Sequence, residues 1–142
     1  MQTKVKHYIS NQALNRQNIL TKIHETIVET DTSVEAIVEP MMGNEMIVYK
    51  CKGMMKYGLA SMKNYMTLHV LPIYGSKSLL TKYKLLLNKA IFQKGCINFN
   101  NEDEMPMDIV LKLINDCSKI DLIRIREDYL KSKKSQNKDY GI

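Results

Sequence analysis

Three consecutive segments with the composition of β-strands, joined by very short connections, constrain this chain most. Lys52-Gly53 and Lys63-Asn64 separate the segments and have the composition of tight turns. Strands that follow each other so closely pair antiparallel, so the sequence predicts a three-stranded meander. The segments are EMIVYKC at 45–51, MMKYGLASM at 54–62 and YMTLHVLPI at 65–73.

The third segment alternates between apolar and more polar side chains. Because successive side chains of a strand point to opposite faces, its residues divide into two sets. The set that faces the core is predicted to be Met66, Leu68 and Val70. The set on the wetter face is Tyr65, Thr67 and His69. One face of the sheet is therefore expected to be open, as antiparallel sheets permit.

Helical patterns precede the meander. Residues 11–29 carry apolar side chains at spacings of three and four, which predicts a long helix. Thr32 and Glu35 have the spacing of a capping box, which predicts a short second helix. Pro40 would end that helix, since proline has no amide hydrogen to donate.

The second half of the chain predicts one more strand among three helices. A helix is expected from about 76 to 88, capped by Ser76 or Ser78. FQKGCINF, at 92–99, reads as a single edge strand in which Gly95 marks a bulge or a positive φ. Pro106 suits the start of the next helix.

The last predicted helix begins after Asp121, which can cap it, and residues 131–142 form a polar tail that we expect to fray. The order of elements is thus ααβββαβαα. The predicted class is α+β in two layers, with one mainly antiparallel sheet, a meander plus an edge strand, packed against helices in a single domain over 1–142.

Composition excludes several functional classes. No apolar run is long enough to span a bilayer, and the first residues lack the apolar stretch of a signal peptide, so we expect a cytoplasmic protein without a membrane partner. The net charge of +6 comes from scattered lysines, which favours a solvated surface over nucleic-acid binding. The chain contains no phosphate-binding loop, zinc-protease motif or nucleophile elbow, so an enzyme is not the leading expectation.

Two long stretches resemble the YdhG-like family, also called DUF1801. They are MIVYKCKGMMKYGLASMKNYMTLHVLPIYG and LLTKYKLLLNKAIFQKGCINFNNEDEMPMDIVLKLI, and the likeness covers about residues 13–120. Lys94, Gly95, Phe99 and Pro106 match the family's Lys-Gly pair, aromatic and helix-starting proline.

The resemblance implies a two-layer fold likened to frataxin, and some family members are described as iron chaperones. The chain departs from the family pattern before the first strand: Glu35 matches the family's acid, but Glu39 stands in place of its aromatic and Met42 in place of its proline. An iron site would need a carboxylate cluster, and the dense carboxylates here are Glu102, Asp103, Glu104 and Asp108. Their position before a helix is also explained by the helix dipole.

Five residues are the candidates for a ligand site on the wetter face of the sheet. His69 and Tyr65 belong to the third strand segment, and Tyr57 is expected near them. Lys94 and Cys96 are two apart, so on one strand they would share a face, and the ammonium would favour the thiolate. Both residues also have a purely structural interpretation: Cys96 as a small side chain packed at the sheet edge, and His69 as a hydrogen-bonded strand residue.

The leading functional expectation is a non-enzymatic protein that binds a small ligand or a protein partner, without a cofactor. Two alternatives remain open: an iron carrier that uses the acidic segment, and a redox protein that uses Cys96. The three cysteines are widely spaced and form no CxxC motif, which predicts free thiols.

Overall fold

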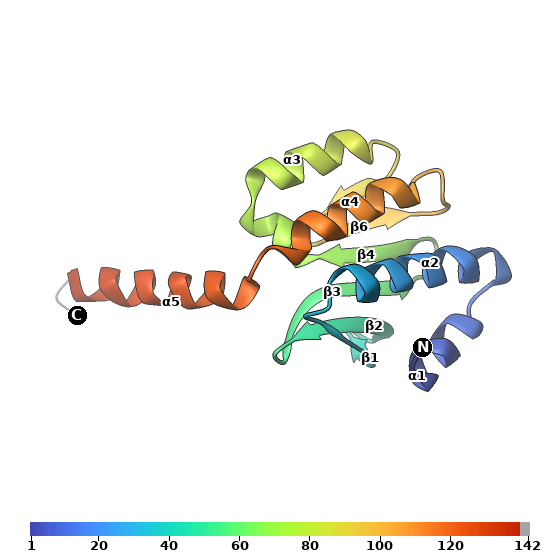
Figure 1. The fold of residues 1–142 in the computed structure, drawn as a ribbon, viewed down its shortest axis with the longest axis horizontal. Helices are drawn as coiled ribbons and strands as arrows, with labels where there is room; N and C mark the ends of the chain where they lie inside the picture. The colour runs from blue at the N-terminus through green and yellow to red at the C-terminus, as the bar shows by residue number, and fades with distance from the viewer. Residues whose placement is uncertain (140–142) are drawn as a thin grey trace.

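The computed structural model describes residues 1–139. It consists of two layers, an antiparallel sheet and helices over one of its faces, and the last helix runs outward from these layers (Figure 1). The helices are α1 (Thr3–Ser10), α2 (Leu14–Thr30), α3 (Lys77–Leu86), α4 (Met107–Ser118) and α5 (Leu122–Asp139), with a short 3-10 helix η1 (Leu71–Gly75). The strands are β1 (Glu35–Met41), β2 (Asn44–Cys51), β3 (Met54–Ser61), β4 (Met66–Val70), β5 (Ile91–Gln93) and β6 (Cys96–Phe99). They lie in the order β1-β2-β3-β4-β6-β5, so the predicted α+β class and meander are confirmed.

The predicted division of the third segment between two faces is also confirmed. Met66, Leu68 and Val70 are fully buried in the main core. Helices α2 and α4 pack against each other over this face, as Figure 1 shows. Within residues 1–139, no helix lies over the opposite face (Figure 1). Across residues 1–139, no helix has both the length and the apolar character that a membrane crossing requires.

The predicted short helix after Thr32 is wrong, because residues 35–41 form the edge strand β1. Glu35 pairs with Lys50 and Met41 with Asn44, so the segment joins the sheet as the first strand of a hairpin. The turn residues Met42 and Gly43 both have positive φ, as in a type I′ turn. Pairing with β2 overrides the local capping signal, and Pro40 is tolerated on an edge strand.

The prediction of one strand at 92–99 is also wrong, although the positive φ predicted at Gly95 is confirmed. Gly95 has φ of +88° and turns the chain between β5 and β6, which pair as a tight hairpin. β5 forms the sheet edge, and β6 inserts between it and β4. The sheet has six strands instead of four because β1 was expected to be a helix and this hairpin a single strand.

Most helices begin and end close to their predicted positions. The Ser76 hydroxyl accepts a hydrogen bond from the Leu79 amide, and Asp121 accepts one from the Arg124 amide, so both caps are confirmed. The N-terminal residues form α1, whose apolar side chains were not recognised as a helical pattern. Helix α5 runs through residues 131–139, the part of the polar tail that the structure describes and that we expect to fray. The rest of that tail lies outside the described residues.

We predict that Gly95→Val lowers the free energy of unfolding by about 1 kcal/mol or more, since a β-branched residue resists positive φ. A Cβ at this position would have space, with Tyr74 as its nearest neighbour at 3.5 Å, so the cost arises in the backbone. Gly95→Asn should cost less, because Asn tolerates this conformation. Urea denaturation measures both, and a Val variant as stable as the wild type would contradict the prediction.

Candidate functional site

Four polar side chains form a compact block on the helix-free face of the sheet. Thr67 of β4 lies opposite Asn98 of β6, and His69 lies opposite Cys96 on the same pair of strands. Directly opposed residues have Cβ atoms about 4.5–5.5 Å apart. Strand pairing therefore brings together side chains from positions about 30 residues apart in the sequence.

Methionines are prominent on the rest of this face, over which the described part of the chain places no helix. Met46 is buried and forms a small apolar cluster with Val48 and Ala60. Gly58 provides the space above the strands, because a Cβ there would stand 2.6 Å from Met55 Cε and 3.0 Å from Met46 Sδ. The half-buried side chains packed against this cluster are Ile37, Met41, Met55 and Met62.

The methionine layer and the polar block line a partly open hollow of about 140 Å³, which we call the sheet-face cavity. Its floor is formed by the four polar residues of the block and by Tyr65. Its walls come from the turn and strand residues Met41, Met42, Asn44, Met46 and Met62.

Two oxygens at this cavity are buried without a hydrogen-bond partner among the described residues: Thr67 Oγ1 and Asn98 Oδ1. Both residues are more than nine-tenths buried. The Asn98 amide nitrogen is satisfied, since it donates to Gln93 Oε1 at 3.1 Å. An unsatisfied buried acceptor costs about 1–3 kcal/mol, so a donor that displaced the neighbouring side chains and reached either oxygen would be stabilised there.

His69 is held neutral by its surroundings. Burial lowers the pKa of its imidazole, while a hydrogen bond with the backbone of Gly95 acts in the opposite direction without reversing the shift. The ring is therefore a neutral hydrogen-bonding group at pH 7.

The structure brings three of the five predicted site residues together: Tyr65, His69 and Cys96 all line the sheet-face cavity. The other two lie elsewhere. Tyr57 faces the helix side and is fully buried in the main core, so its predicted place beside His69 is wrong. Lys94 lies in the β5–β6 turn and not on a strand with Cys96, because Gly95 reverses the chain between them.

A second polar cluster lies inside the protein and was missed from the sequence. The pairing of β2 and β3 shifts register so that Tyr49 faces Tyr57 while Lys50 faces Met55. Lys56 is the extra residue of this bulge, and bulges re-aim side chains. Its ammonium reaches the Asp31 carboxylate at 2.8 Å, and both side chains are at most 4% exposed.

Asp31, at the end of α2, is fully engaged by its neighbours. Its carboxylate accepts hydrogen bonds from the Tyr57 hydroxyl at 2.7 Å and from the backbone and hydroxyl of Ser33, besides that of Lys56. Burial raises the pKa of Asp31, but these donors together outweigh burial, so the pKa lies below its ordinary value. No sequence signal marked this cluster, since the bulge interrupts the alternation on which strand predictions rely.

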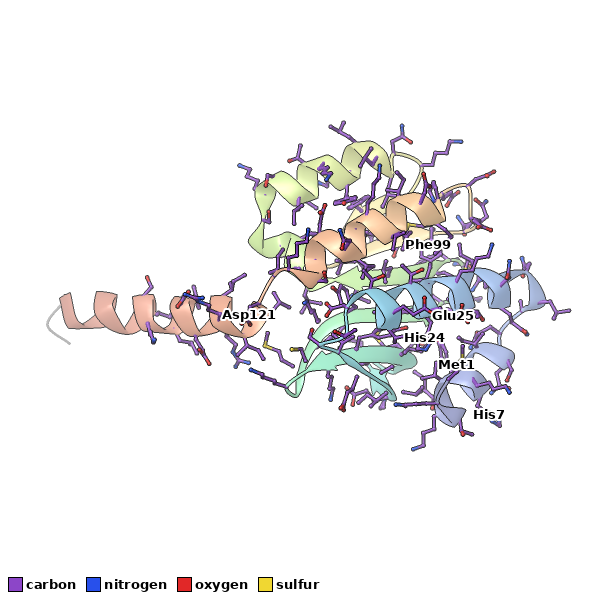
Figure 2. The ribbon with its side chains drawn as sticks, viewed as in Figure 1. Met1, His7, His24, Glu25, Phe99 and Asp121 are labelled. Atoms are coloured by element: carbon purple, nitrogen blue, oxygen red, sulfur yellow. The ribbon has the colours of Figure 1, made fainter. Side chains whose placement is uncertain are left out.

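The neighbouring pair His24 and Tyr49 belongs to the same buried layer. His24 Nδ1 lies 2.7 Å from the Tyr49 hydroxyl, and Figure 2 shows His24 on the side of α2 that faces the strands. Burial lowers the pKa of His24, which favours its neutral form. His24 Nδ1 and the Tyr49 hydroxyl thus serve each other as hydrogen-bond partners.

The acidic residues before α4 are partly engaged in local structure. Glu102 pairs with Lys22 at 3.0 Å, and Glu104 accepts a hydrogen bond from the Asn100 amide. Asp108 lies in the first turn of α4, where a carboxylate stabilises the helix dipole. Within residues 1–139, no group of three or more His, Cys, Asp or Glu side chains is placed to hold a metal ion.

Comparisons with known proteins provide no relative for this chain: no family model, no curated protein and no solved structure matches it. The site therefore has to be interpreted from its own chemistry.

We predict that Asp31→Asn lowers the free energy of unfolding by about 3–5 kcal/mol at pH 7, because it leaves the Lys56 ammonium buried without its counter-charge. The folded-state pKa of Asp31 is depressed. Its stabilisation is therefore present above the unfolded pKa of about 3.9 and is lost as the pH falls through the lower folded value. The difference between wild type and variant should shrink below about pH 4.

Denaturation with urea from pH 3 to pH 7 measures this difference. The control is Asp103→Asn, a change at an exposed carboxylate that should alter stability by less than about 0.5 kcal/mol at any pH. An Asp31→Asn effect below about 1 kcal/mol, or one that is constant with pH, would show that the ion pair contributes little.

Proposed function

We propose that the protein is a binding protein that takes a small, largely apolar ligand in the sheet-face cavity. The observation that carries the proposal is that Thr67 and Asn98, two residues that line one cavity, each hold a buried side-chain oxygen with no hydrogen-bond partner in the described chain. As part of the same proposal, the chain is YdhG-like, with two layers that leave one sheet face for binding.

The size of the cavity limits the ligand. A volume of about 140 Å³ is close to the roughly 150 Å³ of an engineered protein cavity that binds benzene. Methionine side chains are flexible and polarizable, so the walls can adjust to ligands of different shapes. A single ring, or an apolar group of that size, therefore fits.

The polar floor limits the chemistry of the ligand. Asn98 Oδ1 can only accept a hydrogen bond, and the Thr67 hydroxyl can donate or accept. The ligand should therefore carry an O–H or N–H group beside its apolar body. Neutral His69 adds a hydrogen-bonding group without a charge, so an uncharged ligand is favoured over an ion.

Phenol and toluene are matched probes, because they share a ring and differ in the hydroxyl group. We predict that phenol binds roughly 2- to 10-fold more tightly than toluene, the ratio that one net hydrogen bond gives. Ligand-observed NMR titration measures both affinities. In Asn98→Leu and Thr67→Val variants the two probes should bind with more similar affinities.

Lys84→Gln, an exposed change on α3 away from the cavity, is the control and should leave both affinities unchanged. If neither probe binds at millimolar concentration, or if Asn98→Leu leaves the ratio unaltered, the proposal is wrong.

A second candidate is chemistry at Cys96, and one observation favours it. The sequence places no histidine near this cysteine, but strand pairing puts His69 directly opposite it. Cys96 is half-buried, whereas burial raises the pKa of Cys117 to about 12, so that thiol is inert at neutral pH. Selective alkylation of Cys96 at pH 7 that is slowed by His69→Gln would support this candidate, whereas slow alkylation unaffected by the change would oppose it.

A further inference from the structure

We propose that a second cavity, at the junction of α4 and α5, binds a small apolar carboxylate. This junction cavity has a volume of about 260 Å³ and lies between the β2–β3 turn and residues 118–123. Figure 2 marks Asp121 at the point where α5 leaves the body of the protein. It shares no lining residue with the sheet-face cavity, so the proposal is independent of the one above.

Three lysines from three parts of the chain line the junction cavity: Lys52 in the β2–β3 turn, Lys56 in the β3 bulge and Lys119 after α4. Lys56 is buried and gives one hydrogen bond to Asp31. An ammonium has three donors, so Lys56 retains donors for a ligand. Lys52 and Lys119 form no ion pair with the described residues.

The nearby carboxylates do not offset this positive charge. The charge of Asp31 is neutralised by its ion pair with Lys56, and its carboxylate oxygens also accept hydrogen bonds from Tyr57 and Ser33. Asp121 uses its Oδ1 to cap α5 through the Arg124 amide. Asp116 interacts with Lys119, but its carboxylate pairs with Lys82 and accepts a hydrogen bond from the Tyr83 hydroxyl. Lys52 and Lys119 therefore exceed the remaining carboxylate, that of Asp121, by one positive charge, which favours one anionic group.

The remaining wall of the junction cavity is apolar, so the part of the ligand that contacts it should be apolar too. Apolar side chains come from the β2–β3 hairpin and from the start of α5: Cys51, Met54, Ile120, Leu122 and Ile123. Ser33 and Ser118 also line the cavity, but their hydroxyl groups already donate to Asp31 and to the Asn115 carbonyl, so the lysines are the donors left for an anion. An apolar chain or ring that ends in a carboxylate matches this combination, whereas a small inorganic anion would leave the apolar wall without a contact.

Octanoate, octanol and octylammonium are suitable probes, because they share one apolar chain and differ only in the charge of the head group. We expect octanoate to bind at least about 10-fold more tightly than octanol, as hydrogen bonds to an ionised group are stronger. Octylammonium should bind more weakly than octanol. Octanoate binding should weaken as salt rises from about 10 mM to 0.15 M, where screening shortens the range of the lysine charges.

Protein-observed NMR titration measures these affinities and locates the site, with the largest shifts expected at the amides of residues 118–123. The double variant Lys52→Gln/Lys119→Gln should bind octanoate at least about 5-fold more weakly and leave octanol unchanged. Lys84→Gln/Lys112→Gln removes the same charge from exposed lysines outside the cavity and is the matched control. Ser118→Phe, which fills the cavity without changing its charge, should abolish the binding of both probes.

Equal affinities for octanoate and octanol would overturn the assignment of a carboxylate. Shifts centred on His69 and Cys96 would place the ligand in the other cavity and would overturn the proposal, as would the absence of octanoate binding in a folded protein.

Discussion

The buried ion pair between Asp31 and Lys56 fixes how the two layers of this protein meet. Asp31 ends α2 and Lys56 belongs to β3, so their contact ties the main helix to the middle of the sheet. The bulge in β3 is what makes this contact, because regular alternation would direct Lys56 to the opposite face. Two charges removed from water are stable only when they are paired and hydrogen-bonded. For the Asp31 carboxylate, Tyr57 and Ser33 donate the additional hydrogen bonds.

The same bulge determines which side chains of β3 point to the helix-free face. After it, Tyr57 and Leu59 point to the helices, while Gly58 and Ala60 point away from them. These two small residues leave room that the methionines fill, and the polar block of β4 and β6 lies beside them. The small residues and the methionine lining of this face thus follow from the register of β3. We propose that this adaptable lining accepts a ligand.

The sequence predicts the parts of this structure that depend on local pattern. The alternation in 65–73 correctly assigns Tyr65, Thr67 and His69 to one face, and the Ser76 and Asp121 caps lie where their hydroxyl and carboxylate groups suggest. The β1–β2 turn has the pair Met42-Gly43 in place of the usual Asn-Gly, so its hairpin gives no local signal. The bulge, the opposition of His69 and Cys96, and the junction cavity depend on pairings between distant segments, which local pattern does not encode.

Binding at the helix-free face is the central claim, and the methionines allow it to be tested directly. With ¹³C-methyl methionine, NMR spectra report separately on the sheet-face cavity, through Met41, Met46 and Met62, and on the core of the helix side, through Met66 and Met105. Titration with phenol should shift the first three methyl signals and leave the last two in place. Shifts confined to Met54, in the junction cavity, or no shifts at saturating phenol, would contradict the claim.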